Sequence, residues 1–321
     1  MEKEKQEFSL TVPVVFFVFK RLDTTMQVFE KIRKAEPAKL YVISDAPRAH
    51  VQGEKEKVEE VRSYIDNHID WDCEVIHHYA EENMGCGKRL SSGITWVFER
   101  EEQAIILEDD CVPDDTFFRY CQEMLEYYKD DDRILLISGN NPIANYYHTD
   151  HDYLFSNVPF IWGWATWKRA WDLYDYRIKT WPENKKNPLI KKAIPVKKAY
   201  WLYTSEFDLL NSGKFDDTWS YQFMYTGIIN GMYGILPSQS HVFNIGFMEE
   251  STHTKNAPTW VTQDVQPVSF PIKHREKVEW DRDFDVCYMN YAGEHGLTIK
   301  IKYLLGLDIN KSIFEIFKKK H

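Results

Sequence analysis

The chain has 321 residues and a formal net charge of −10, and 43% of its residues are hydrophobic and 15% aromatic. A chain of this length can bury a core in one large or two small domains without disulfides or structural metals. The acidic charge balance argues against nucleic acid as the main partner, because phosphate backbones are bound through Lys and Arg.

The cysteines and the N-terminus bear on the compartment. The five cysteines are widely spaced and include no CxxC pair, which predicts free thiols and gives no zinc signature. The stretch MEKEKQEF at 1–8 lacks the apolar core of a signal peptide, and no run of about 18 apolar residues occurs. We therefore expect a soluble cytoplasmic chain.

Strands and helices are expected to alternate along the first 140 residues. The run VPVVFFVF at 12–19 is continuously apolar, which indicates a strand covered on both faces. Asp23 can then cap a helix that extends to about Ala35. Further strands are expected at 40–44, 73–77, 104–107 and 134–138, and further helices at 54–68, 90–100 and 116–128. This alternation predicts an α/β fold with a Rossmann-like, mainly parallel sheet and helices on both faces.

The pattern changes after Gly139. Residues 140–215 hold Trp-rich and Lys-rich pieces of irregular periodicity, which suggests a smaller subregion beside the sheet. The tail at 297–321 is amphipathic and net basic, unlike the rest of the chain. Such a segment can lie on an anionic membrane surface, or it can pack on the domain with its last lysines in solvent.

Three acids follow a buried strand directly. The apolar run at 104–107 ends in Glu108, Asp109 and Asp110. If the strand continues, Glu108 and Asp110 point to one side and Asp109 to the other. Adjacent carboxylates repel one another unless a cation joins them, and Mn²⁺ or Mg²⁺ shared with phosphate oxygens meets that need. The alternative is a solvated loop before a helix N-terminus.

Arg21 and Asp45 also follow strands of the predicted sheet. Ligands of parallel α/β sheets bind at the carboxyl ends of the strands. Arg21 can hold a pyrophosphate oxygen there, and Asp45 can accept a hydrogen bond from a base or ribose. A surface salt bridge is the alternative for each residue.

Two further segments carry candidate residues. Asp216 and Asp217 precede Trp219, and a carboxylate beside an aromatic ring can act as a general base. A helix N-cap at Asp217 is the competing interpretation. His253 lies in a polar stretch and is either exposed or a contact for metal or phosphate.

The order of these motifs resembles the GT-A-fold nucleotide-sugar glycosyltransferases, in particular the N-acetylglucosaminyltransferase I type and bacterial hemolysin-like glycosyltransferases. The resemblance extends to about residue 290. It rests on PVVFFVFKR at 13–21, YVISDAPR at 41–48, NMGCGKRLSSGITWVFE at 83–99, AIILEDDCVPDDTFFRY at 104–120, LLISGNN at 135–141, GWATWKRAW at 163–171, DDTWSYQF at 216–223, FNIGFMEESTHT at 243–254 and FPIKH at 270–274.

This resemblance implies roles for the residues at the strand ends. Asp110 would ligate the divalent metal that bridges the diphosphate of the nucleotide. Asp109 would face the ribose or the water shell of the metal, and Glu108 would face the donor sugar. Arg21 would hold the pyrophosphate, and Asp45 would contact the uracil edge.

Roles in the second half of the chain are implied in the same way. His253 stands where related enzymes place a metal or phosphate contact, and the stretch that contains Trp164 would line the donor and acceptor pocket. Related bacterial sequences often read TWDYQ, whereas Ser220 stands here in place of that acid. The catalytic base would then be Asp217 or Asp216.

The resemblance implies a metal-dependent inverting glycosyltransferase that moves a hexosyl or N-acetylhexosaminyl group from a UDP-sugar to a glycan or a lipid-linked acceptor in bacterial polysaccharide biosynthesis. Residues 1–290 would form the GT-A domain, with a nucleotide-binding half at 1–140 and an acceptor and catalytic half at 141–290, and 291–321 would form the tail. The cofactor would be Mn²⁺ or Mg²⁺, and the tail could bring the protein to the inner face of the membrane.

Two alternatives stay open. A nucleotidyltransferase on a related fold would carry a glycine-rich basic loop after the first strand, where this chain reads FKRLDTT. A non-catalytic protein that binds nucleotides or carbohydrates could keep the same fold. A dehydrogenase is disfavoured because the GxGxxG fingerprint is absent.

Overall fold

The computed structural model describes residues 8–215, 217–246, 261 and 264–292. The first part holds β1 (Val14–Val18), α1 (Leu22–Ala35), β2 (Lys39–Ser44), α2 (Glu54–His68), β3 (Glu74–Tyr79), α3 (Cys86–Phe98), β4 (Gln103–Glu108), β5 (Cys111–Pro113), α4 (Phe117–Tyr127) and β6 (Ile134–Ser138). The second part holds β7 (Tyr153–Ser156), β8 (Trp164–Trp167), α5 (Lys168–Trp171), α6 (Trp181–Asn184), α7 (Pro188–Ala193), α8 (Lys197–Asn211), α9 (Ser220–Asn230), β9 (Tyr233–Pro237), β10 (Val242–Asn244) and α10 (Arg282–Ala292).

Eight strands form one mixed sheet in the order β3-β2-β1-β4-β8-β6-β9-β7. The strands β3, β2, β1 and β4 run parallel to one another. Next to them β8 is inserted antiparallel between β4 and β6, and β7 is antiparallel to β9. A separate antiparallel pair, β5 and β10, lies beyond the end of β4. The carboxyl ends of β1, β2 and β4 therefore meet at one edge of the sheet, where ligands of such sheets bind.

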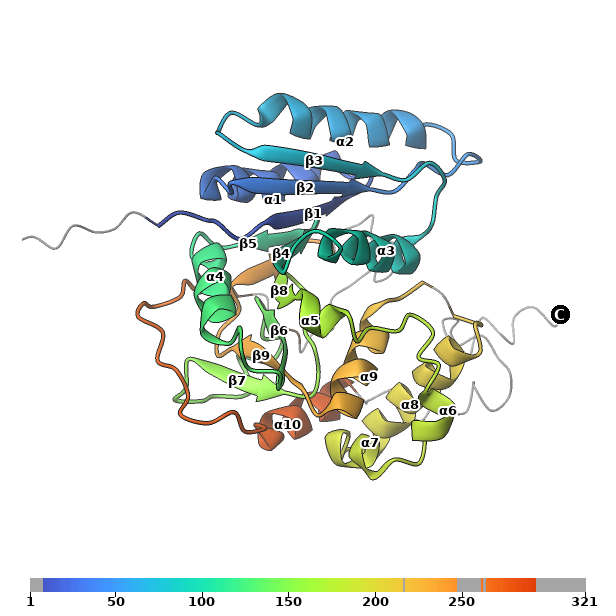
Figure 1. Cartoon of the computed structure of the whole chain (residues 1–321), viewed down its shortest axis with the longest axis vertical. Helices are drawn as coiled ribbons and strands as arrows, with labels where there is room; N and C mark the ends of the chain where they lie inside the picture. Colours follow the sequence, from blue (N-terminus) through green and yellow to red (C-terminus); the bar gives the residue numbers. More distant parts are fainter. Residues whose placement is uncertain (1–7, 216, 247–260, 262–263, 293–321) are drawn as a thin grey trace, which may run out of the picture.

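Alternating side chains of the central strands enter two different hydrophobic layers. On β1, Val14 and Phe16 pack with Phe29 of α1, whereas Val15 and Phe17 pack with Ile94 of α3. This follows from the two-residue repeat of a strand. Helices therefore cover both faces of the sheet (Figure 1), and the predicted α/β fold with a large sheet of mostly parallel strands is confirmed.

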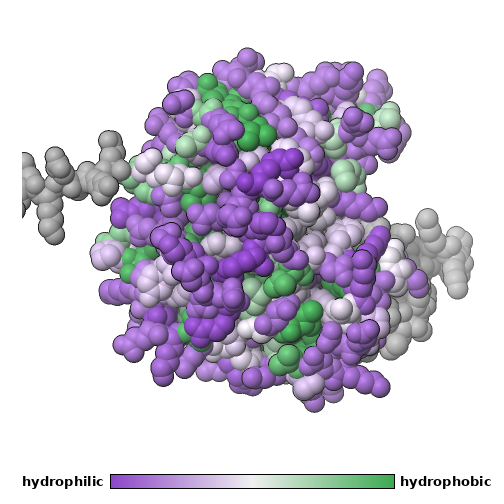
Figure 2. All heavy atoms as spheres, in the orientation of Figure 1, coloured by the Kyte–Doolittle hydropathy of each residue, from purple (hydrophilic) through white to green (hydrophobic). Residues whose placement is uncertain are grey.

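A third hydrophobic cluster joins the second-half helices. It holds Ile190 of α7, Phe207 of α8, Met224 of α9 and Phe284 of α10, which pack beside the β9–β7 side of the sheet (Figure 1). These helices all come from the part of the chain after Gly139, where the sequence pattern is irregular. The face of the molecule in Figure 2 is mostly hydrophilic, with separate hydrophobic patches. Among the described helices, none is both long and apolar enough to cross a bilayer.

Several expected boundaries are corrected. The first helix begins at Leu22 with Arg21 at its N-cap, so Asp23 lies inside the first turn and is not the cap. The third helix begins at Cys86, four residues before the expected 90. The apolar pattern on which the expectation depended starts only at Leu90, after the first turn of the helix. The basic tail expected at 291–321 lies almost wholly outside the described residues, which end at 292.

Candidate functional site

The end of β4 brings the acids to Arg21. Strands β1 and β4 are parallel, with Phe17 opposite Glu108, so the residues that follow the two strands lie together. Nη2 of Arg21 donates to Oδ2 of Asp110 at 2.9 Å and also to Oδ1 of Asp109. The backbone carbonyl of Arg21 caps α1 by accepting from the Thr25 amide at 3.0 Å. The N-terminus of α1 therefore holds the backbone of Arg21 at a position from which its side chain reaches the acids.

The expected alternation of the three acids is wrong. Strand β4 ends at Glu108, and Asp109 and Asp110 form a turn. Both aspartates consequently reach the same guanidinium instead of pointing to opposite sides. The alternative of a solvated loop also fails, because Asp109 is only 5% exposed.

Burial and mutual repulsion disturb the ionisation of these acids. Burial, followed by the charges of Asp110 and Asp109, raises the pKa of Glu108 to about 8. The pKa of Asp109 is also raised by burial, although Arg21 opposes the shift. Oδ2 of Asp109 is buried and has no hydrogen-bond partner among the described residues. A buried carboxylate oxygen without a partner is unfavourable, and among the described residues Arg21 supplies the positive charge beside it.

The segment after β10 closes over Asp110. The amide of Ile245 donates to the carbonyl of Asp110 at 2.8 Å. A Cβ on Gly246 would lie 2.2 Å from Oδ2 of Asp110, so glycine permits this close approach of backbone to carboxylate. The side chain of Asn244 secures the turn by accepting from the Gly246 amide at 2.8 Å. The chain then continues into residues 247–260, which include His253 and lie outside the described part.

Asp45 organises the loop before α3. Its carboxylate accepts from the amides of Ala46 at 2.9 Å, Met84 at 3.0 Å and Gly85 at 3.0 Å, and from Nδ2 of Asn83 at 3.1 Å. No surface salt bridge of the kind considered for Asp45 occurs among the described residues. Both carboxylate oxygens are engaged inside the chain, so their direct observed effect is to hold the 83–85 loop. Contact with a uracil ring stays a prediction.

Asp217 approaches the same loop from the second half of the chain. A Cβ on Gly85 would lie 3.6 Å from Oδ1 of Asp217. The next residue, Cys86, lies among the acids: burial raises its pKa, and the charges of Glu108, Asp217, Asp110 and Asp109 raise it further. Helix α9 begins at Ser220 with Trp219 at its N-cap, so the alternative that Asp217 caps this helix is wrong. The structure thus brings Asp217 to the acid triplet.

Trp164 lies behind the site. Its side chain is 1% exposed and stacks on Trp219, with ring centroids 5.2 Å apart and planes at 24°. Because Trp219 follows Asp217 by two residues, this stack supports the segment that carries the aspartate. The predicted contact of Trp164 with a donor sugar is not tested by this arrangement. Asp216 lies outside the described residues.

Sequence reasoning missed two features of this cluster. Cys86 stands at its centre, and the residues 83–85 form the loop that Asp45 holds. Both belong to the NMGCG stretch, whose two closely spaced glycines were the available signal. A chemical role was not assigned because the acids that surround Cys86 come from distant parts of the sequence.

The donor set was tested against a divalent ion. Within the described part of the chain, no group of three or more His, Cys, Asp or Glu could hold a metal by itself. Mg²⁺ and Mn²⁺ are commonly held by one or two carboxylates together with substrate phosphates and water. Asp110 and the unpartnered Oδ2 of Asp109 fit such a shared site. They do not form a closed site of the structural zinc type.

Comparisons with known proteins give limited similarity. No protein-family model and no curated protein match the chain. A solved structure of S. aureus TarS 1-349 has a TM-score of 0.41 and 10% identity over 74% of this chain, which spans 61% of that structure. An apo UDP-glucose pyrophosphorylase has a TM-score of 0.37 and 9% identity, covering 73% of this chain and 93% of its own. HddC from Yersinia pseudotuberculosis has a TM-score of 0.33 and 13% identity, covering 50% of this chain and 78% of its own. Similarity of this degree assigns no activity.

Proposed function

We propose that this protein is a nucleotide-sugar glycosyltransferase that uses Mn²⁺ or Mg²⁺ and a UDP-sugar donor. The observation that carries the proposal is the convergence of Arg21, Asp109, Asp110 and Asp217 at the carboxyl edge of a mostly parallel sheet. Such an edge is where ligands of these sheets bind. The GT-A fold, the domain division at 140 and 290, and the inverting outcome are parts of the same proposal.

Arg21 and Asp110 would receive the diphosphate. Asp110 would hold the divalent ion with Asp109, and the bound ion would neutralise charge on the departing nucleotide. Only Nη2 of Arg21 contacts the acids, and its Nε and Nη1 make no hydrogen bond to the described residues. These two nitrogens can donate to phosphate oxygens while the ion pair is kept.

Asp217 would act on the acceptor. Asp217 is exposed, in contrast to the buried Asp109, and its carboxylate lies beside Gly85 of the 83–85 loop. From there it can remove a proton from an acceptor hydroxyl as that oxygen attacks the anomeric carbon. Asp216 remains the second candidate for the base, and His253 the second candidate for the metal.

The proposal is tested with a panel of UDP-sugars by measuring Mn²⁺-dependent UDP release, and with calorimetry of UDP binding. Asp110→Asn should abolish the metal-dependent part of UDP binding and leave the fold intact. Asp115→Asn is the matched control, because Asp115 is a nearby acid that pairs with Lys31 instead of the cluster. Unchanged UDP–Mn²⁺ affinity in Asp110→Asn would exclude the metal site. If the protein binds UDP but releases no UDP from any UDP-sugar of the panel, it is a non-catalytic nucleotide-binding protein.

The acceptor is proposed to be a glycan or a lipid-linked saccharide, met at the inner face of a bacterial membrane. The basic segment at 297–321 would then dock on anionic lipid. Sedimentation with anionic vesicles should be salt-sensitive and should be lost when residues 311–321 are deleted, with UDP binding retained. Sedimentation that is indifferent to the deletion would contradict docking through the tail.

A further inference from the structure

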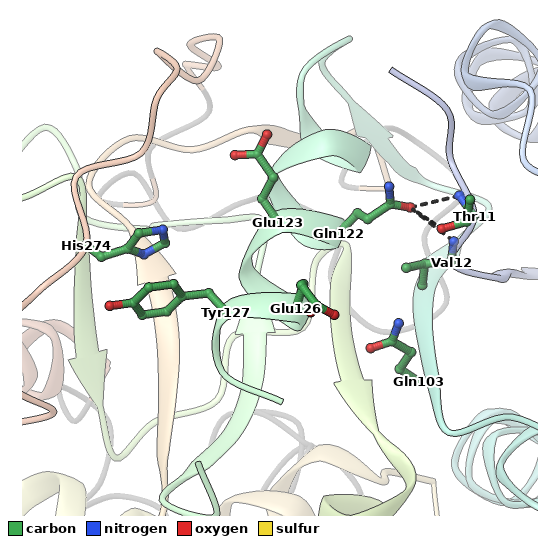
Figure 3. Close-up of a pocket in the computed structure, with 8 residues that line it drawn as sticks. All are labelled: Thr11, Val12, Gln103, Gln122, Glu123, Glu126, Tyr127 and His274. Carbon is green, nitrogen blue, oxygen red and sulfur yellow. Dashed lines mark hydrogen bonds between the residues drawn. The ribbon is translucent and has the colours of Figure 1, made fainter. Parts of the chain in front are cut away.

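A hollow of about 490 Å³ lies at the opposite end of the sheet from the acids. Tyr127 and His274 form one side, and Val12 and Gln103 form the other (Figure 3). Helix α4 runs between the two sides and contributes its acidic face (Figure 3). This volume is within the range of small-molecule sites in proteins, which is about 300–1,000 Å³.

Strand β4 separates this hollow from the acid cluster. Gln103, the first residue of β4, lines the hollow, whereas Glu108, its last residue, belongs to the acids. Five steps along a strand cover about 17 Å at a rise of roughly 3.3 Å per residue. A ligand in the hollow therefore does not share the diphosphate site.

One wall of the hollow is fixed by Gln122. Its Oε1 accepts from the amides of Thr11 at 2.8 Å and Val12 at 3.1 Å, and its Nε2 donates to the carbonyl of Ser9 at 3.0 Å (Figure 3). These bonds tie the residues before β1 to α4. The wall is thus built by the described fold itself and does not need a ligand to form.

Tyr127 offers an open aromatic face. Its ring stacks on His274, with centroids 3.5 Å apart and planes at 3°. The residue is nevertheless 52% exposed. One ring face is covered by the imidazole, so the exposure comes largely from the other face and the hydroxyl edge. A ring that is already held in place by such a stack offers a rigid apolar surface that a ligand can cover at little cost in side-chain entropy.

The charges that border the hollow are already paired. Glu123 accepts from Nε of Arg119 at 2.7 Å, and Glu126 accepts from Nζ of Lys129 at 2.6 Å. Burial lowers the pKa of His274, so its imidazole is neutral near pH 7. A cationic ligand therefore gains little here. The paired carboxylates still have free lone pairs that can accept hydrogen bonds from hydroxyl groups.

Gln103 adds a polar group without a partner. Its side-chain amide makes no hydrogen bond to the described residues, although the residue lines the hollow. An amide both donates and accepts, which matches a hydroxyl group that does the same. The hollow thus combines an aromatic face, two acceptors and one amide around a neutral space.

We propose that this hollow is a saccharide-binding site for an uncharged oligosaccharide, in which one sugar ring packs on Tyr127 and the hydroxyls of the neighbouring rings bond to Glu126 and, past α4, to Gln103. The apolar C–H face of a pyranose covers the open ring, and its hydroxyl edge meets the polar side. The site is separate from the reaction centre and does not depend on the transfer activity. It would hold a saccharide chain at a distance from the acids.

The test uses saturation-transfer NMR with maltotetraose, cellotetraose and chitotetraose, in the presence of saturating UDP and Mn²⁺. At least one of these sugars should show transfer to its ring protons. Tyr127→Ala should weaken that binding by about tenfold or more, the usual effect of removing a stacked aromatic anchor. Tyr127→Phe should largely keep it, because the ring remains. Tyr146→Ala is the matched control, since Tyr146 is 49% exposed on another part of the surface.

Gln103→Ala supplies a second variant and should weaken the same sugar without a change in thermal melting. The proposal is overturned if no sugar of the panel binds, or if Tyr127→Ala and Tyr146→Ala behave alike. A signal that appears only when UDP and Mn²⁺ are left out would place the sugar at the acids and would also overturn the proposal. Salt-sensitive binding of trilysine in place of the sugars would identify a site for basic peptides instead.

Discussion

The two ends of β4 have opposite electrostatic character. At the carboxyl end, Glu108, Asp109 and Asp110 lie close together, and one oxygen of Asp109 has no described partner. At the amino end, the acid Glu123 has a basic partner on the same helix, Arg119, and Glu126 has one just after the helix, Lys129.

This contrast indicates what each end can bind. Buried carboxylates that raise one another's pKa favour a cation, and a cation in turn brings phosphate. Solvent-exposed carboxylates that are already paired add little net charge, so the hollow at the other end suits an uncharged ligand. The same kind of residue is thus proposed to hold a metal with phosphate in one place and to accept hydrogen bonds from hydroxyl groups in the other.

The largest effect is expected from the proposed base, which belongs to the carboxyl end alone. Asp217→Asn should lower turnover by roughly 10²–10⁴, the usual size of a general-base contribution, with little change in UDP binding. Steady-state turnover and UDP calorimetry measure the two quantities on one preparation. If Asp217→Asn keeps normal turnover and Asp216→Asn loses turnover, Asp216 is the base instead of Asp217. Normal turnover in both would place the base elsewhere.

Arg21 should have the next largest effect. Arg21→Ala should weaken UDP by about 1.5–3 kcal/mol, the range for hydrogen bonds to charged groups. The loss should be greater for UDP than for UMP, and uridine should be almost unaffected, because only the phosphates meet the guanidinium. Calorimetry with the three ligands measures this series. Equal losses for uridine and UDP would contradict the phosphate role. The exposed Arg33, which pairs with Asp70, provides the control substitution.

Much of the first half of the chain, up to about residue 140, could be predicted because its signals are local. The bounds of α2 and β6 follow from the periodicity of Glu54–His68 and from the apolar run Ile134–Ser138. Their apolar residues repeat at helix or strand spacing within one segment. The Rossmann-like alternation was therefore readable before any contact was known.

The rest of the fold depends on contacts between distant segments. Strand β8 enters the sheet antiparallel between β4 and β6, and no local pattern around Trp164 specifies those neighbours. The turn at Asp109 likewise breaks the alternation that a continued strand would give. Asp217 reaches Gly85 from more than a hundred residues away. Only the resemblance to a known family suggested that Asp217 belongs with the triplet.

The hollow at the amino end was not predicted at all. Its parts are Gln103, Tyr127 and His274, which come from a strand, a helix and an irregular segment. Each of these residue types is common in its kind of element, and none of the three belongs to a recognisable sequence motif. Their chemistry becomes visible only once Tyr127 and His274 are seen to stack with one ring face still open.

The last prediction concerns the stability of the protein without ligands, and it compares the two ends of β4 directly. Glu108 has a pKa of about 8 in the fold against the ordinary 4.5. Between these values the folded chain keeps a proton that the unfolded chain has released. The free energy of unfolding must therefore fall as the pH rises through this window, by up to about 1.4 kcal/mol per pH unit. Below pH 4.5 both states are protonated, and the penalty disappears.

Thermal melting from pH 5 to pH 8 without metal or nucleotide measures this effect. Glu108→Gln removes the ionisable group, so its melting temperature should approach or exceed that of the wild type at pH 8 and show a weaker pH dependence. Glu126→Gln is the matched control at the amino end, because Glu126 is exposed and paired with Lys129. It should follow the wild-type curve. The same pH dependence in Glu108→Gln as in the wild type would mean that repulsion within the triplet does not limit stability, and the electrostatic contrast between the two ends of β4 would lose its thermodynamic support.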